Sequence, residues 1–171
     1  MKAKKKTKIV FKDLTSKNLP KFKKSVLKSE LTFPEPIRST FDDYLNFLSV
    51  ENSVAKVALL NSKYIGNIIG FSPTIEIIEE EGLEGIVENP NTIYVFNFVI
   101  DSKYQDKGYG HQLLQNFIKS AKEKGYEKLV GHARQNNSLY LGKKFGAKEK
   151  SVHKNWSDTE EDYILCELDL A

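Results

Sequence analysis

Cysteine is almost absent from this sequence, since Cys166 is the only one in 171 residues. A single cysteine excludes an intramolecular disulfide framework and a thiolate-based zinc site, and it is typical of a reducing compartment. The sequence also lacks an apolar run near the roughly 18 residues needed to cross a membrane. Its lysine-rich first residues are not followed by the apolar stretch of a secretory signal. We therefore expect a cytoplasmic protein without a membrane span.

The remaining composition is that of an ordinary globular protein. Hydrophobic residues make up 40% of the chain, charged residues make up 29%, and the formal net charge is +3. A chain of this length buries about 70% of its unfolded surface on folding, which is enough for one core. We find no internal repeat and no low-complexity linker, so we expect one domain over residues 1–171.

Charge is distributed unevenly along the chain. Residues 1–28 contain eleven lysines and one acidic residue, Asp13, whereas residues 76–88 contain six glutamates and no lysine or arginine. The lysines would attract phosphate groups. No aromatic platform or known nucleic-acid motif accompanies them, so we prefer a solvated surface and do not expect nucleic acid as a partner. The glutamates are either a solvated loop between strands or a surface that favours cations.

Apolar periodicity and turn residues predict an α/β protein with a mixed sheet. Residues 92–100 (TIYVFNFVI) are apolar on both faces and indicate a central buried strand. The expected strands are residues 8–12, 54–60, 64–78, 92–100, 128–132, 147–156 and 163–170. The expected helices run from a cap at Thr15 or Ser16 to Glu30, from a cap at Ser39 or Thr40 to Asn52, and over residues 109–124 and 137–145. The resulting order is βααβββαβαββ.

A glycine-containing turn, Gln105-Asp106-Lys107-Gly108-Tyr109-Gly110, joins the central strand to the next helix. Glycines let backbone N–H groups approach a ligand, and a helix N-terminus favours an anion, so the turn suits a pyrophosphate. Lys103 and Lys107 add positive charge, and a purely structural connection is the alternative. A Rossmann fingerprint is excluded because Leu113 stands where a small residue is needed. A P-loop is excluded because the sequence has no Gly-Lys-Ser or Gly-Lys-Thr.

The run Gln105-x-x-Gly108-x-Gly110 resembles the acetyl-CoA-binding motif Gln/Arg-x-x-Gly-x-Gly/Ala of the GNAT N-acetyltransferase superfamily. The order of elements is also similar to that family's order. A later part of the chain resembles the family's second motif; it consists of Ala133-Arg134-Gln135-Asn136-Asn137-Ser138 followed by Lys144-Phe145-Gly146-Ala147. The resemblance covers nearly the whole chain. It implies the GNAT fold, acetyl-CoA as the acetyl donor, and direct transfer to an amine.

The resemblance also implies which residues contact the cofactor. The backbone of residues 98–100 would pair with the pantetheine arm, and Asn136 would steady that arm between two strands. The glycine-containing turn and the first helical residues would hold the pyrophosphate. The implied cofactor-binding residues are Phe98, Val99, Ile100, Gln105, Asp106, Lys107, Gly108, Tyr109, Gly110, His111 and Asn136.

Acetyl transfer needs a neutral amine, a stabilised oxyanion and a proton for the departing thiolate. An alkyl amine with a pKa of about 10.4 is protonated at neutral pH, so a base or a water chain must take its proton. A backbone N–H of the central strand, at Val99 or a neighbour, is expected to stabilise the oxyanion. Many GNAT enzymes have a tyrosine that protonates the thiolate and a glutamate at the start of the central strand. At the matching positions this chain has Gly142 and Tyr94. Tyr140 is the candidate acid, with packing as its alternative, and a water relay is preferred to any named base.

The resemblance places the acceptor between the connection of the first two helices, here residues 33–38, and the turn between the last two strands. Asn97, on the central strand, either orders a water there or makes a structural hydrogen bond. The candidate acceptor-binding residues are Phe33, Glu35, Asn97, His153 and Trp156, with packing on the sheet as the alternative for His153 and Trp156. The three histidines have no metal-ligand spacing, so no metal is expected.

One function is preferred, and two alternatives remain. We expect an N-acetyltransferase, a monomer or a homodimer, that moves the acetyl group of acetyl-CoA to a primary amine. The acceptor would be a small polyamine, an amino-acid-like molecule or a protein amine. A non-catalytic acyl-CoA-binding or sensor module is the first alternative, because of the missing tyrosine and glutamate. A nucleic-acid-binding protein that uses the first lysines is the second.

Overall fold

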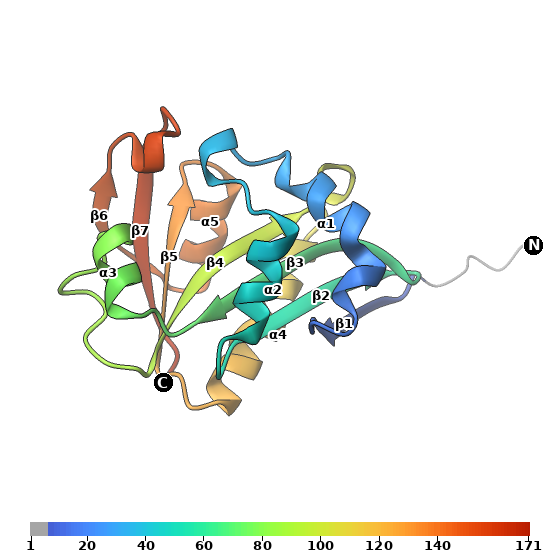
Figure 1. Ribbon diagram of the computed structural model, residues 1–171, viewed down its shortest axis with the longest axis horizontal. Coiled ribbons are helices and arrows are strands. Elements are labelled where there is room, and N and C mark those ends of the chain that lie inside the picture. Colours follow the sequence, from blue (N-terminus) through green and yellow to red (C-terminus); the bar gives the residue numbers. More distant parts are fainter. Residues whose placement is uncertain (1–6) are drawn as a thin grey trace, which may run out of the picture.

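A seven-stranded mixed sheet forms the centre of the protein (Figure 1). A computed structural model describes residues 7–171. The strands are β1 (Ile9–Asp13), β2 (Val54–Leu60), β3 (Lys63–Phe71), β4 (Thr92–Ile100), β5 (Lys128–Arg134), β6 (Lys148–His153) and β7 (Tyr163–Asp169). The helices are α1 (Lys23–Glu30), α2 (Phe41–Ser49), α3 (Ile75–Glu81), α4 (Tyr109–Glu123) and α5 (Asn137–Lys144). The strand order is β1-β2-β3-β4-β5-β7-β6, which confirms the predicted α/β class with a mixed sheet.

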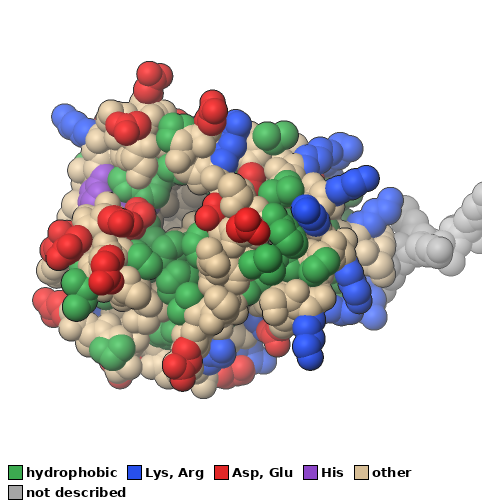
Figure 2. Space-filling model, in the orientation of Figure 1, with side chains coloured by type: hydrophobic (Ala, Val, Ile, Leu, Met, Phe, Trp, Pro, Cys, Tyr) green, Lys and Arg blue, Asp and Glu red, His purple; other side chains and the backbone are tan. Residues whose placement is uncertain are grey.

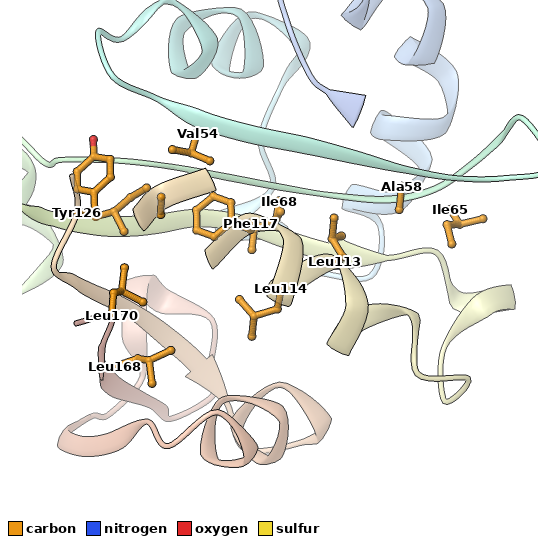
Figure 3. Close-up of a cluster of buried hydrophobic side chains, with 12 residues drawn as sticks. Val54, Ala58, Ile65, Ile68, Leu113, Leu114, Phe117, Tyr126, Leu168 and Leu170 are labelled. Atoms are coloured by element: carbon orange, nitrogen blue, oxygen red, sulfur yellow. The ribbon is translucent and has the colours of Figure 1, made fainter. Parts of the chain in front are cut away.

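Helices cover both faces of this sheet. On one face, α4 and the strands share a buried cluster that contains Leu113, Leu114, Phe117, Ile68 and Ile93 (Figure 3). On the other face, α1 and α2 share a second cluster, which contains Val26, Tyr44, Val57 and Ile69. A third cluster beside α3 contains Leu83, Tyr94, Val130 and Leu165. Strand β4 contributes to the first and third clusters, which explains why its sequence is apolar on both faces.

The parallel strands β4 and β5 diverge after a short paired segment. Their pairing joins only residues 92–94 to residues 128–130. Beyond these pairs β4 continues to Ile100 along β3, while β5 continues to Arg134 along β7. A wedge-shaped gap therefore opens between the two strands, with Tyr94 and Val130 at its apex. We call this feature the splay.

The predicted strand over residues 64–78 is wrong in its second half. Strand β3 ends at Phe71, and residues 75–81 form the additional helix α3, so the order of elements is βααββαβαβαββ. Thr74 caps this helix by accepting a hydrogen bond from the N–H of Ile77 at 3.3 Å. Gly82 ends it in the left-handed conformation, which glycine adopts without steric cost. Most of the acidic residues therefore lie on a helix rather than on a loop between strands.

Other helices and strands begin or end a few residues away from their predicted boundaries. The first helical segment begins after Asn18, later than the expected cap at Thr15 or Ser16, with a 3₁₀ turn over Leu19–Phe22 before α1 starts. Thr40 forms a reciprocal capping box with Asp43, which confirms the predicted start of α2. Strand β6 ends at His153, before positive φ angles at Asn155 and Ser157. None of the helices within residues 7–171 is long and apolar enough to cross a membrane.

Candidate active site

The N-terminus of α4 is an open anion site beside the splay. Gly108 is its N-cap residue at a φ of 81°, and no side chain in residues 7–171 caps the helix. The first turn holds no acidic residue, so its free N–H groups and the helix dipole favour a negative charge. Asp106, also at positive φ, accepts a hydrogen bond from Nδ2 of Asn137 at 2.8 Å. This bond ties the turn before α4 to the start of α5.

The backbone of β4 offers unpaired groups to the splay. The N–H of Asp101 donates to the carbonyl of Ile65 on β3 at 2.8 Å, and backbone groups alternate in direction along a strand. Val99 therefore faces β3, and its carbonyl lies against Gly66. Phe98 and Ile100 face the splay, where Nε2 of Gln105 donates to the carbonyl of Ile100 at 2.9 Å. The backbone of Val99 is therefore not free to pair with a pantetheine arm, as was expected for residues 98–100, and of the expected oxyanion donors only its neighbours face the splay.

Helix α5 closes the far side of the splay. Asn136 caps it by accepting from the N–H of Ser138 at 2.9 Å. Leu141 is the α5 side chain nearest to the place where a Cβ at Gly110 would lie. The ring of Tyr140 is instead 62% exposed, with the ammonium of Lys144 above it at 4.7 Å. The side chain of Tyr140 therefore faces solvent, whereas the next residue, Leu141, faces α4.

A line of hydrogen-bonded side chains starts at the apex of the splay, on the face of the sheet that carries α3. The hydroxyl of Tyr94 lies 2.6 Å from Nδ1 of His132. Nε2 of His132 lies 3.1 Å from Nδ1 of His153, and Nε2 of His153 lies 3.0 Å from Oγ of Ser151. The indole of Trp156 stacks on the His132 ring at 4.3 Å. The structure thus brings His153 and Trp156, two of the predicted acceptor residues, to one place.

A buried carboxylate lies on the same face of the sheet. Glu30, at the end of α1, is only 3% exposed. Its Oε1 accepts from the hydroxyl of Tyr44 at 2.5 Å and from Nδ2 of Asn97 at 2.6 Å, and its Oε2 accepts from the N–H of Ser39 at 2.8 Å. Asn97 also accepts from Asn67 at 2.8 Å. Asn97 is therefore buried in a structural network, which is the second of its two expected roles, and it is not presented to an acceptor as its place among the candidate acceptor-binding residues implied.

The two predicted acceptor-binding connections meet. The 3₁₀ turn Glu35–Ile37, which follows Phe33, contacts the turn Trp156–Asp158. Arg134 joins both connections, because it donates to both carboxylate oxygens of Glu161 at 2.8 and 2.7 Å and to the carbonyl of Thr32 at 3.0 Å. An open, polar hollow of about 650 Å³ lies beside this arginine, lined also by Gln135, Asn136, Glu160, Glu161 and Asp162.

Figure 2 shows this face of the molecule, which is hollowed between the elements just described. Acidic side chains surround the hollow, including those over α3, and a histidine lies at its edge. Lysine and arginine side chains gather at the other end, over α1 and β1. The hydroxyl of Tyr163, a residue 4% exposed, has no hydrogen-bond partner within residues 7–171.

Comparison with known proteins agrees with this geometry. A family model described as the acetyltransferase (GNAT) family matches residues 23–146. The chain belongs to the GNAT family. A [ribosomal protein bS18]-alanine N-acetyltransferase from Haemophilus influenzae is 35% identical over 100 residues, which span 57% of this chain and 60% of that relative. The match thus covers about three fifths of the relative's length.

Solved structures of GNAT proteins share the fold. The ribosomal-protein-S18-alanine N-acetyltransferase from Escherichia coli superposes with a TM-score of 0.71 over 96% of this chain and 95% of that chain, at 18% identity. A GNAT family acetyltransferase from Elizabethkingia anophelis, solved with acetyl-CoA bound, gives a TM-score of 0.66 over 94% and 97% of the two chains, at 22% identity. At these identities the comparison shows the fold alone.

Three residues beside the candidate site were not identified as candidates from the sequence. Glu30 is a charged residue at a helix end, where no local pattern marks it as buried. His132 was considered only as a metal ligand, although it follows by two residues the β5 position that pairs with Tyr94. Tyr163 begins a β-prone strand and reads as core. Within residues 7–171, no group of three or more His, Cys, Asp or Glu side chains is placed to hold a metal ion.

His132 should make folding sensitive to acid. Burial, with the nearby positive form of His153 as the second cause, lowers the pKa of His132 to about 3 from 6.5. Between these values the unfolded chain binds the proton and the folded chain does not, so the free energy of unfolding falls as the pH falls. We expect the His132 contribution to lose about 2 kcal/mol between pH 8 and pH 5. Urea unfolding of wild type and His132→Asn at both pH values measures this difference, and equal pH slopes would contradict it.

Proposed function

We propose that this GNAT protein transfers the acetyl group of acetyl-CoA directly to a primary amine. The observation that carries the proposal is the junction of two features. The splay exposes the backbone of Phe98 and Ile100, and it ends at the open N-terminus of α4. An extended pantetheine arm can pair with those backbone groups as an added strand, while the pyrophosphate lies at the helix N-terminus.

The proposed cofactor site uses the residues expected from the motif. Backbone groups of residues 105–110 and the side chain of His111, which stacks on Phe145 at 4.6 Å, surround the pyrophosphate position. Lys103 and Lys107 add positive charge, and Asn136 holds the start of α5 beside the splay. When acetyl-CoA is bound, it supplies a thioester carbon to the amine. The N–H of Phe98, which faces the splay, is the proposed oxyanion donor.

The charge of the acceptor side favours a cationic substrate. The carboxylates over α3 and those of residues 160–162 lie around the hollow, and carboxylates raise the local concentration of a cation. An amine at neutral pH is such a cation. The proposed acceptors are therefore a small polyamine, an amino-acid-like amine or a protein amine. The Haemophilus influenzae relative is named for an alanine of a ribosomal protein, which supports including alanine N-terminal peptides in a screen.

Calorimetric titration with acetyl-CoA tests the cofactor half of the proposal, with NAD and ATP as controls. Selective binding at micromolar concentration is the expected result. Release of free CoA thiol across a panel of polyamines, amino acids and N-terminal peptides then tests catalysis. Binding of acetyl-CoA without release of CoA on any amine would favour a non-catalytic acyl-CoA-binding module, to which the exposure of Tyr140 points.

Tyr140 is the proposed proton donor to the thiolate. It lies on the helix that flanks the splay, and its ring, which faces solvent beside the ammonium of Lys144, would have to turn inward to reach the thiolate. Tyr140→Phe is expected to lower kcat by about 100-fold, since general acid catalysis contributes that much, and to leave the Kd for acetyl-CoA within twofold. Thiol release and calorimetry give the two values. An unchanged kcat would leave Tyr140 as a surface residue.

A further inference from the structure

The line from Tyr94 through His132 and His153 to Ser151 has the donors and acceptors of a proton relay. If the Tyr94 hydroxyl donates to Nδ1 of His132, then Nε2 of His132 carries a hydrogen and donates to His153. Nε2 of His153 then carries a hydrogen and donates to Ser151. Every atom of the line has a defined role with both imidazoles neutral, and no two donors face each other.

One end of this line lies at the apex of the splay, and the other end lies at the protein surface. Tyr94 is the last residue of β4 that pairs with β5, so it lies at the apex of the splay, four residues before Phe98, the proposed oxyanion donor. Ser151 is exposed on the edge strand β6. The line therefore runs from the buried end of the site to solvent.

The surrounding elements fix the two imidazoles. Trp156 stacks on His132 at 4.3 Å. A Cβ at Gly82, the residue that ends α3, would lie 2.8 Å from Cε1 of His153, so that ring has no room to move toward the helix. The other titratable groups near the line are Glu81, on α3 beside Tyr94, and Tyr163, on β7 next to Trp156 and to the Arg134–Glu161 pair. Burial keeps His132 uncharged at neutral pH, so it can pass a proton only by exchanging tautomers.

We propose that Tyr94, His132, His153 and Ser151 carry the proton of the acceptor ammonium to solvent. This proposal rests on the proposed acetyl transfer. The ammonium gives one proton to the Tyr94 hydroxyl through waters in the splay, while the hydroxyl proton passes to Nδ1 of His132. The proton on Nε2 of His132 passes to Nδ1 of His153, and the proton on Nε2 of His153 leaves to water beside Ser151. Exchange of protons with water at the two partly exposed imidazoles then restores the starting tautomers without rotation of either ring.

The relay balances the transfer reaction. The neutral amine attacks the thioester carbon, the C–N bond forms, and the C–S bond breaks. Tyr140, the proposed donor, protonates the thiolate, and the second amine proton restores its hydroxyl, so each acetyl group transferred releases one proton to water. Tyr94 stands at the position where many GNAT enzymes have a glutamate, and the relay gives this chain a route for the proton without a carboxylate there.

The pH dependence of kcat/KM tests the relay in the full-length protein with an amine that the thiol-release screen identifies. Tyr94→Phe and His132→Asn are each expected to lower kcat/KM about 100-fold at pH 7, and His153→Asn about tenfold. The loss should shrink to about threefold at pH 9.5, because solvent then deprotonates the amine without help. The Kd for acetyl-CoA should stay within twofold, and Lys154→Gln, an exposed neighbour of His153, should match wild type.

The possible outcomes separate the relay from the proposed function. Variants that keep the wild-type kcat/KM at pH 7, or lose the same factor at every pH, overturn the relay while acetyl transfer stands. His153→Asn keeps the test valid if the other variants misfold. The side chain of His153 is partly exposed, so the far-ultraviolet circular dichroism of this variant should match that of wild type. A wild-type protein that binds acetyl-CoA and acetylates no amine overturns the proposed function, and the relay with it.

Discussion

Gly110→Glu is expected to abolish acetyl-CoA binding and leave the fold intact. A Cβ at Gly110 would lie 3.5 Å from Leu141, 3.6 Å from Ile100 and 3.8 Å from Phe98, all ordinary contacts, so a side chain fits there. It would point into the mouth of the splay, one residue from the free N–H groups at the start of α4. A carboxylate there repels a pyrophosphate and occupies its donors. Calorimetry should show at least a roughly 100-fold weaker Kd, which is about 2.7 kcal/mol.

Two matched variants separate charge from shape. Gly110→Ala adds the Cβ alone, and the GNAT motif admits alanine at this position, so binding should stay within about threefold while helix propensity rises. Gln115→Glu adds the same charge to an exposed position further along α4 and should also bind normally. Gly108→Glu is less clean, because a φ of 81° strains any residue with a side chain. Normal binding by Gly110→Glu would show that the turn is only a connection.

The elements that form the proposed cofactor site could be predicted from the sequence because their signals are local. The apolar run of β4, the glycines at 108 and 110, and the amphipathic pattern of α4 each act within a few residues of the chain. Asn136 likewise caps α5 from the adjacent position. The direction of each backbone group could not be predicted from the sequence. Whether the N–H and carbonyl of Val99 point toward β3 depends on the register between β3 and β4.

Helix α3 shows how a local signal can mislead. The run Ile75-Glu76-Ile77 alternates apolar and charged residues, as a strand does, and it follows a strand directly. The competing signals were Pro73 and Thr74, which end the strand and cap a helix, and Gly82, which stops it. These signals decided the structure. Strand β3 already pairs with β2 on one side and with β4 on the other, so residues 75–81 have no free sheet edge beside β3 on which to pair.

The acceptor half could be predicted only as two connections, because its contacts span long distances in sequence. Arg134 reaches Thr32 across 102 residues, and Tyr94 reaches His132 across 38. No spacing rule relates such pairs before the sheet order is known. The resemblance to the GNAT family indicated which connections meet, but not the side chains that join them.

Glu30 joins three of these distant parts, so its removal should have the largest effect on stability. Its carboxylate accepts hydrogen bonds from Tyr44 on α2, from Asn97 on β4 and from the N–H of Ser39 between the two helices. Burial raises the pKa of Glu30 while these donors lower it. The three bonds thus offset the cost of burying the group and fix the connection that borders the proposed acceptor site.

Glu30→Ala is expected to lower the free energy of unfolding by roughly 3 to 5 kcal/mol, because it leaves three donors unpaired, two of them buried, and a cavity beside them. Each kcal/mol lowers the melting temperature of a chain of this size by about 2 to 4 °C, so differential scanning calorimetry should show a fall of about 10 °C. Tyr44→Phe removes one donor and should cost about 1 kcal/mol. Glu35→Ala, at an exposed position in the same connection, should change little. If Glu30→Ala and Glu35→Ala melted together, the network would contribute nothing to holding α1 and α2 on β4.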